Sequence, residues 1–175
     1  MTFTEDWFSV QSERALANLA LTTGRLSGKV VEVGCWEGRS TCALANAVAP
    51  DTLHAVDTWA GSPGEPSERL AGERDVLATF KANIQTLTAG NVEIHHESWQ
   101  DFFSRDVGPI RLLHIDASHS YDEVRGNIEA ALPFIVPGGI VCGDDAHYGP
   151  VTDAARDVLQ HFYVVASLWV WRKGD

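Results

Sequence analysis

The sequence predicts a doubly wound α/β fold, built on a mostly parallel seven-stranded sheet that ends in a C-terminal antiparallel hairpin. Short β-branched strands alternate with amphipathic helical segments along most of the chain, a pattern typical of a parallel sheet covered on both faces. The first strand runs into a glycine turn and an alanine-rich helix, and the last two strands are separated only by about Ser167. So short a connection permits only an antiparallel pair, because a parallel crossover needs roughly a dozen residues.

The length and composition suit one domain. The chain has 175 residues, of which 45% are hydrophobic, enough for a sizeable buried core. We therefore expect a single domain over residues 1–175, in which residues 1–28 form an N-terminal helical cover. Within this cover, residues 5–21 place Trp7, Phe8, Leu16 and Leu19 at helical intervals, which indicates an amphipathic helix packed on the sheet.

The strands and helices follow one another in a regular order. The predicted strands cover residues 29–33, 52–57, 91–95, 110–115, 139–142, 162–166 and 168–172. After the N-terminal helix, the predicted helices cover residues 40–48, 75–88, 99–104, 121–135 and 151–160. Residues 58–74 are rich in Gly, Pro, Ser and Glu and predict a mobile loop within the domain.

The charge and hydropathy of the chain exclude two kinds of partner, nucleic acids and membranes. A value of −11 opposes the basic surface of a nucleic-acid-binding protein, so neither DNA nor RNA is an expected partner. The chain starts with acidic residues and no apolar run reaches membrane-spanning length, so we expect a cytoplasmic protein with no signal peptide and no membrane contact. Cys35, Cys42 and Cys142 form no CxxC pair, lie among apolar residues and are expected to be buried, reduced thiols.

The glycine turn after the first strand indicates a ligand that approaches the backbone at the carboxyl end of the sheet. A dinucleotide-binding turn would have the spacing GxGxxG, whereas here Gly34 and Gly38 enclose Cys35, Trp36 and Glu37. Glu32 and Glu37 would also face a pyrophosphate with negative charge, which opposes phosphate binding at a helix N-terminus. A ligand that carries positive charge fits this turn better.

These residues resemble motif I of the class I S-adenosylmethionine (AdoMet) methyltransferases. The resemblance rests on Glu32-Val33-Gly34 and Gly38-Arg39-Ser40, and on the terminal hairpin, and it covers residues 29–173. Asp116, Asp144 and Asp145 further resemble the metal-dependent O-methyltransferases, both the catechol type and the macrolide-sugar type. The resemblance implies a Rossmann-like sheet, AdoMet as the cofactor and a hydroxylated small molecule as the substrate.

The resemblance also implies a role for each residue along the cofactor site. Glu32, the Gly34 turn, Gly38 and Ser40 would lie at the methionine end of AdoMet, although Glu32 and Ser40 can instead tie a loop and cap the helix. Asp57 would accept from the ribose hydroxyls, or else form a strand-end turn.

The adenine end of the site is expected after the second and third strands. Ser98, Trp99 and Gln100 follow the third strand and are expected to contact adenine, while Trp99 is equally compatible with core packing. Thr58 and Trp59 start the long loop after the second strand, and Trp59 is expected to form a wall of the cofactor or substrate site.

Three carboxylates are predicted to meet at the carboxyl rim of the sheet. Asp116 ends one predicted strand beside the cofactor site, and Asp144 and Asp145 follow another. Three anions repel one another unless a cation joins them, and Mg²⁺ prefers such oxygen ligands. The alternative is that each acid caps a following helix or turn.

Two histidines are candidates for the general base. His119 lies three residues after Asp116, where the catechol enzymes carry a lysine, and His147 matches a base of some macrolide-sugar enzymes. Either could instead be a metal ligand or a donor within a loop. The other histidines lie within or beside strand and helix patterns and are expected to be structural: His54, His95, His96, His114 and His161.

The sequence therefore predicts an AdoMet-dependent, Mg²⁺-assisted O-methyltransferase of a sugar or phenolic metabolite. Position 119 lacks the lysine and position 145 lacks the asparagine of the catechol type, so a catechol substrate is not implied. A metal-independent N- or C-methyltransferase, a non-catalytic AdoMet-binding protein and an NAD-binding dehydrogenase are the alternatives, the last opposed by the glycine spacing. Trp169 and Trp171 in the last strand indicate either a homo-oligomer interface or core packing.

Overall fold

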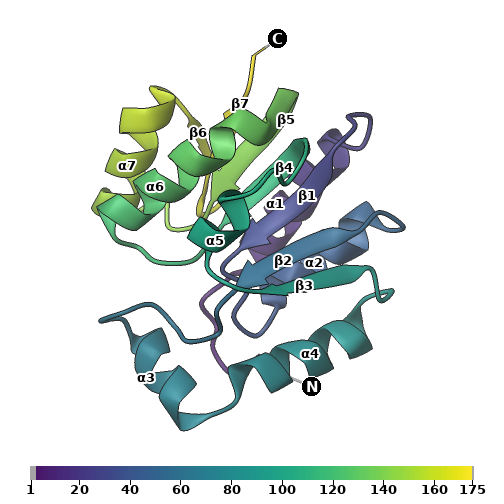
Figure 1. Ribbon diagram of the computed structural model, residues 1–175, viewed down its shortest axis with the longest axis vertical. Helices are drawn as coiled ribbons and strands as arrows, with labels where there is room; N and C mark the ends of the chain where they lie inside the picture. Colours follow the sequence, from purple (N-terminus) through teal and green to yellow (C-terminus); the bar gives the residue numbers. More distant parts are fainter. Residues whose placement is uncertain (1–2, 175) are drawn as a thin grey trace.

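A seven-stranded mixed sheet forms the centre of the computed structural model, which describes residues 3–174 (Figure 1). The strands lie in the order β3-β2-β1-β4-β5-β7-β6, in which β7 runs antiparallel to both of its neighbours and the other neighbouring pairs are parallel. Their bounds are β1 (Lys29–Val33), β2 (Leu53–Asp57), β3 (Val92–His96), β4 (Ile110–Ile115), β5 (Ile135–Gly143), β6 (Tyr163–Val165) and β7 (Leu168–Arg172). The predicted doubly wound sheet and terminal hairpin are confirmed.

Short polar side chains start several of the helices. Ser9, Asp75, Ser98 and Ser120 each accept a hydrogen bond from a backbone N–H of the first turn that follows, as expected of N-terminal caps. The helices are α1 (Val10–Thr22), α2 (Arg39–Val48), α3 (Pro66–Glu73), α4 (Val76–Leu87), α5 (Trp99–Phe103), α6 (Tyr121–Ala131), the 3-10 helix η1 (Leu132–Phe134) and α7 (Gly149–Leu159). None of these described helices has the length and apolarity that a membrane span requires.

The helices cover both faces of the sheet, as the near-continuous apolar strands predict. Adjacent residues of one strand belong to different cores: Leu112 packs with α1 and α2, whereas Leu113 packs with α6 and α7. Figure 1 shows α6 and α7 on one side of the sheet and α1 and α2 behind it. Because both faces are buried, the central strands are rigid and their carboxyl ends give fixed positions for a site.

Two parts of the chain differ from the sequence-based expectation. Residues 58–74, expected to be a mobile loop, contain the helix α3, which begins at Pro66 because the fixed φ of proline suits a first helical turn. Trp169 is only 1% exposed and packs in the core, so it is closed to a subunit interface. Trp171 is partly buried against the same core.

The turn after β1 brings two backbone segments into contact. Gly34 has φ of +85°, and a Cβ at this position would lie 2.2 Å from the carbonyl oxygen of Asp116. The Gly34 N–H donates to Val56, and the Asp116 N–H donates to Val33. Only glycine lets the loops after β1 and β4 approach this closely, which brings the predicted cofactor turn beside the predicted metal ligand.

We expect Gly34→Ala to lower the free energy of unfolding by about 3 kcal/mol or more, because the methyl group adds a backbone clash to the strained φ. Gly64→Ala is the matched control, since Gly64 has φ of +78° and no atom near an added Cβ. The control should lose only about 1 kcal/mol. Urea denaturation measures both values, and equal losses in the two variants would contradict this account of the turn.

Candidate active site

A wide cleft opens at the carboxyl ends of β1, β2, β3 and β4. The residues predicted for the cofactor that line this cleft are Gly34, Ser40, Asp57, Thr58, Ser98, Trp99, Gln100 and Asp116. The structure therefore brings together, in one cleft, residues from four separate loops. The N-terminal segment adds Phe3, Glu5, Trp7 and Phe8 to the lining. Residues 5–9 were expected to be helical, but the helix α1 begins only at Val10.

Asp57 holds the glycine turn in place from the end of β2. Its Oδ2 accepts the backbone N–H groups of Cys35 at 2.6 Å and Trp36 at 3.0 Å, and its Oδ1 accepts that of Trp59 at 2.7 Å. Burial raises the pKa of Asp57, while these three donors oppose the rise because they favour the charged form. The carboxylate therefore joins the loops after β1 and β2 and still lines the cleft.

Glu32 lies below the cleft, which differs from its expected contact with the ammonium group of AdoMet. Its side chain is completely buried; Oε2 accepts the Thr41 hydroxyl at 2.5 Å, and Oε1 lies 3.1 Å from Nδ1 of His114. Burial disfavours the charged form of His114, but the hydrogen bond with Glu32 raises its pKa. Glu32 therefore ties β1 to α2 and β4, the structural alternative considered from the sequence.

Trp59, Gly38 and Trp99 were also expected at the cofactor site, and the structure places them as follows. Trp59 is 6% exposed, packs on Phe80 and donates its indole N–H to the Trp36 carbonyl, so it belongs to the core and forms no wall of the cleft. Gly38 caps α2 with φ of +90° and faces Phe80. Trp99 packs against the core, as one of the two expectations had it, and also lines the cleft, with its indole N–H donated to Glu123 of α6.

The predicted metal ligands lie at the rim of the same cleft. Oxygen atoms of Asp116 and Asp145 and a ring nitrogen of His119 lie within 4.8 Å of one another. Asp144 lines the small cavity beneath this rim, but its Oδ1 accepts a hydrogen bond from the Ser167 hydroxyl. His147 is 74% exposed, with Nε2 3.5 Å from Oδ1 of Asp145.

His119 forms ion pairs with two carboxylates. Its Nε2 lies 2.6 Å from Asp145, and its Nδ1 lies 2.8 Å from Glu65. The bond to Asp145 is the main reason that the pKa of His119 rises to about 9. The same bond lowers the pKa of Asp145. His119 is therefore protonated at neutral pH, and its charge partly neutralises the acidic rim.

Asp116 keeps a proton more readily than an ordinary carboxyl group. Burial, followed by the neighbouring charge of Asp144, raises its pKa to about 8. A buried carboxylate next to another carboxylate is the environment that a divalent cation stabilises. The rim residues therefore fit a cation of this kind.

Sequence reasoning missed Glu65 and the ion pairs of the N-terminal segment. The Glu65 carboxylate is hydrogen-bonded to both the backbone N–H and the ring of His119. In the sequence, Glu65 stands between Gly64 and Pro66, and these neighbours indicate only a turn. The backbone N–H of Thr4 donates to Glu37 at 2.7 Å, and Glu5 pairs with Arg74. These contacts join segments more than 30 residues apart, which local patterns do not reveal.

A family model described as a methyltransferase domain matches residues 31–146, well over half of the chain. The chain belongs to this methyltransferase family. The predicted class I AdoMet-dependent methyltransferase is therefore confirmed. No curated protein matches the methyltransferase.

Several solved structures share its fold. The O-methyltransferase NovP is 17% identical with a TM-score of 0.74, and the alignment covers 95% of this chain and 81% of NovP. TomG from Streptomyces achromogenes, an O-methyltransferase solved with SAM, is 18% identical with a TM-score of 0.68, over 95% of this chain and 81% of TomG. An O-methyltransferase from Bacillus cereus in complex with SAH is 16% identical with a TM-score of 0.66, over 94% and 82% of the two chains. At these identities, the likeness shows the fold.

We expect the metal-free methyltransferase to lose stability as the pH rises from 6.5 to about 9. The folded pKa of His119 is raised from 6.5 to about 9, so its ion pairs stabilise the fold fully below pH 6.5 and are lost as the pH passes about 9. The raised pKa of Asp116, about 8, acts in the same direction because the folded state binds the extra proton. Melting temperatures in EDTA should therefore fall across this range, and fall less in His119→Gln. The same pH slope in the variant would contradict the proposed charge of His119.

Proposed function

We propose that this methyltransferase transfers the methyl group of AdoMet to a hydroxyl of a small molecule, with Mg²⁺ held at the acidic rim. The observation that carries the proposal is the gathering of Asp116 and Asp145, with Asp144 beside them, next to the cleft. Fold relatives give support, because NovP and TomG are named O-methyltransferases and CalS11 is named a TDP-rhamnose 3'-O-methyltransferase. A sugar or phenolic metabolite is the substrate class that we propose.

The cleft residues suit AdoMet by their chemistry. A carboxylate offers about four acceptor positions, and Asp57 uses three for backbone N–H groups, which leaves about one for a ribose hydroxyl. Trp99 offers an indole on the cleft wall for the adenine ring, with Ser98 and Gln100 as polar neighbours. Gly34 and Ser40 would hold the methionine end, where glycine permits close backbone approach.

The rim residues suit a hard divalent cation. Asp116, Asp144 and Asp145 would hold Mg²⁺, since all three line the small cavity beneath the rim and offer oxygen ligands. When bound, the ion would lower the pKa of the acceptor hydroxyl.

His147 is the residue that we propose to accept the proton from the acceptor hydroxyl. His119 is a poor candidate because its two ring nitrogens are paired with Glu65 and Asp145, and its pKa of about 9 keeps it protonated. His147 lines the cleft and is mostly exposed, so its ring can reach a bound substrate. His119 then has the positioning role of holding Asp145 and Glu65.

One observation favours a second candidate function. The ion pair of His119 with Asp145, at 2.6 Å, reduces the charge of the rim without a metal. A metal-independent N- or C-methyltransferase, in which the acids orient the acceptor, is compatible with this arrangement. Methyl transfer that persists in EDTA would favour this second function.

Calorimetric titration should show micromolar binding of AdoMet and S-adenosylhomocysteine, and no binding of NAD. Asp57→Ala should weaken AdoMet binding by about tenfold to a hundredfold, because a hydrogen bond to a charged group contributes about 1.5–3 kcal/mol. Asp153→Ala, at an exposed position of α7, is the control and should bind as the parent does. An unchanged affinity in Asp57→Ala would remove Asp57 from the cofactor site.

Release of S-adenosylhomocysteine with hydroxylated sugars and phenols should stop in EDTA and return with Mg²⁺. Asp145→Ala should abolish this Mg²⁺-dependent activity while AdoMet still binds, because the rim ligand is lost and the cofactor cleft is kept. Full activity in EDTA would exclude the metal-assisted reaction.

The same assay separates the two histidines. His147→Ala should lower kcat by about a hundredfold with little change in AdoMet affinity, as expected for loss of a general base. His119→Gln should lower kcat less, since its role is to position other groups. The opposite order would assign the base to His119.

A further inference from the structure

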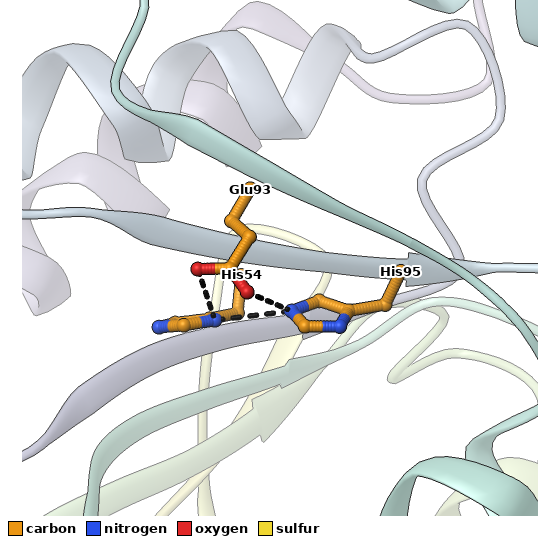
Figure 2. Close-up of side chains that lie close together, drawn as sticks. All are labelled: His54, Glu93 and His95. Atoms are coloured by element: carbon orange, nitrogen blue, oxygen red, sulfur yellow. Dashed lines mark hydrogen bonds and ion pairs between the residues drawn. The ribbon is translucent and has the colours of Figure 1, made fainter.

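A second group of metal-ligating side chains lies away from the cleft, on the edge of the sheet formed by β2 and β3. His54 comes from β2, and Glu93 and His95 come from β3 (Figure 2). His54 pairs in register with Glu93, and His95 lies two residues further along β3, so strand alternation places all three on one face. None of the three lines the cleft described above.

The ligating atoms of these side chains converge. Nδ1 of His54 lies 3.1 Å from Nε2 of His95. The Glu93 carboxylate lies against both rings, 3.6 Å from Nδ1 of His54 and 3.4 Å from Nε2 of His95, as Figure 2 shows. Ligands bound to Zn²⁺ at about 2.0–2.1 Å in a tetrahedral arrangement lie roughly 3.3 Å apart, so these separations match the spacing that such an ion needs.

The surroundings of His95 match those of a metal-ligating imidazole. A ligating histidine directs its other ring nitrogen to a carboxylate or carbonyl that orients the ring. Nδ1 of His95 faces Oε1 of Glu97 at 3.6 Å, an ion-pair distance slightly longer than a hydrogen bond, and Arg105 holds Glu97 through two hydrogen bonds of 2.5 and 2.7 Å. His95 also packs against Phe102 of α5, which limits the movement of its ring.

The three side chains offer two imidazole nitrogens and one carboxylate oxygen as ligand atoms. A neutral imidazole presents a lone pair, whereas a protonated one presents none. Glu93 then supplies the negative charge that compensates the ion.

We propose that His54, Glu93 and His95 bind a divalent transition-metal ion of the Zn²⁺ type, which links β2 to the edge strand β3. Two imidazoles and one carboxylate favour Zn²⁺ over Mg²⁺, because Mg²⁺ prefers oxygen ligands alone. The two proposed cation sites differ in chemistry, since one lies at the oxygen-rich rim and the other on the sheet edge. The edge site is independent of the function proposed for the cleft.

The test is calorimetric titration of the full chain with Zn²⁺ in excess Mg²⁺. The Asp145→Ala background is used, because it removes one ligand of the rim cluster and so weakens metal binding there while the sheet edge is unchanged. We expect one Zn²⁺ per chain with micromolar or tighter affinity, weakened at least about a hundredfold by His95→Ala. In the same Asp145→Ala background, Zn²⁺ should also raise the melting temperature, and it should raise it less once His95→Ala is added.

Two further variants guard against a failure of folding. Glu93→Gln changes an exposed side chain and should fold normally while weakening Zn²⁺ binding by about tenfold or more. His161→Ala removes an exposed histidine outside the cluster and should bind as the parent does. Absence of Zn²⁺ binding in the parent, or equal affinity in the parent, Glu93→Gln and His95→Ala, would overturn the proposal.

Discussion

The carboxylate of Asp57 is the contact on which the cleft depends. Three backbone N–H groups from the loops after β1 and β2 converge on it, so the two loops form one unit around a single buried charge. Without that acceptor, these donors would be left unpaired in a partly buried place, at a cost of about 1–3 kcal/mol each. The glycine turn and the strand end thus depend on the same residue that we propose to contact the cofactor.

The acidic rim shows how the fold tolerates repelling groups. Burial raises the pKa of Asp116 and of Asp144, whereas the neighbouring protonated His119 lowers the pKa of Asp145. Two arrangements reduce the repulsion: retention of a proton by Asp116 and His119, or a bound divalent cation. The proposed cation would compete with these protons, because metal binding requires deprotonated ligands.

Local patterns predicted the fold well. Alternating apolar strands and capped helices predicted the sheet, the hairpin and most element bounds to within a few residues. The convergence of Gly34, Asp57, Ser98 and Asp116 in one cleft also followed, because parallel strands place their carboxyl ends at one edge of the sheet. These features depend on the succession of strands and helices and on the spacing of apolar residues, both of which can be read from one sequence.

Side-chain direction and distant pairing could not be predicted in the same way. Glu32 and Trp59 stand beside the predicted site in the sequence, but their side chains point into the core. There Glu32 is hydrogen-bonded to Thr41 and His114, and Trp59 packs against Phe80. Glu65 reaches His119 across 54 residues, and His54 meets His95 across 41. Such pairs exist only once the strands and loops are packed.

The helix α3 follows Glu65 and carries no buried residue, so little apolar area holds it against the rest of the domain. A displacement of this helix would withdraw Glu65 from His119 and leave Asp145 as the remaining carboxylate partner of that ring. The position of α3 and the proton affinity of the rim are therefore linked, because loss of the Glu65 carboxylate would lower the pKa of His119.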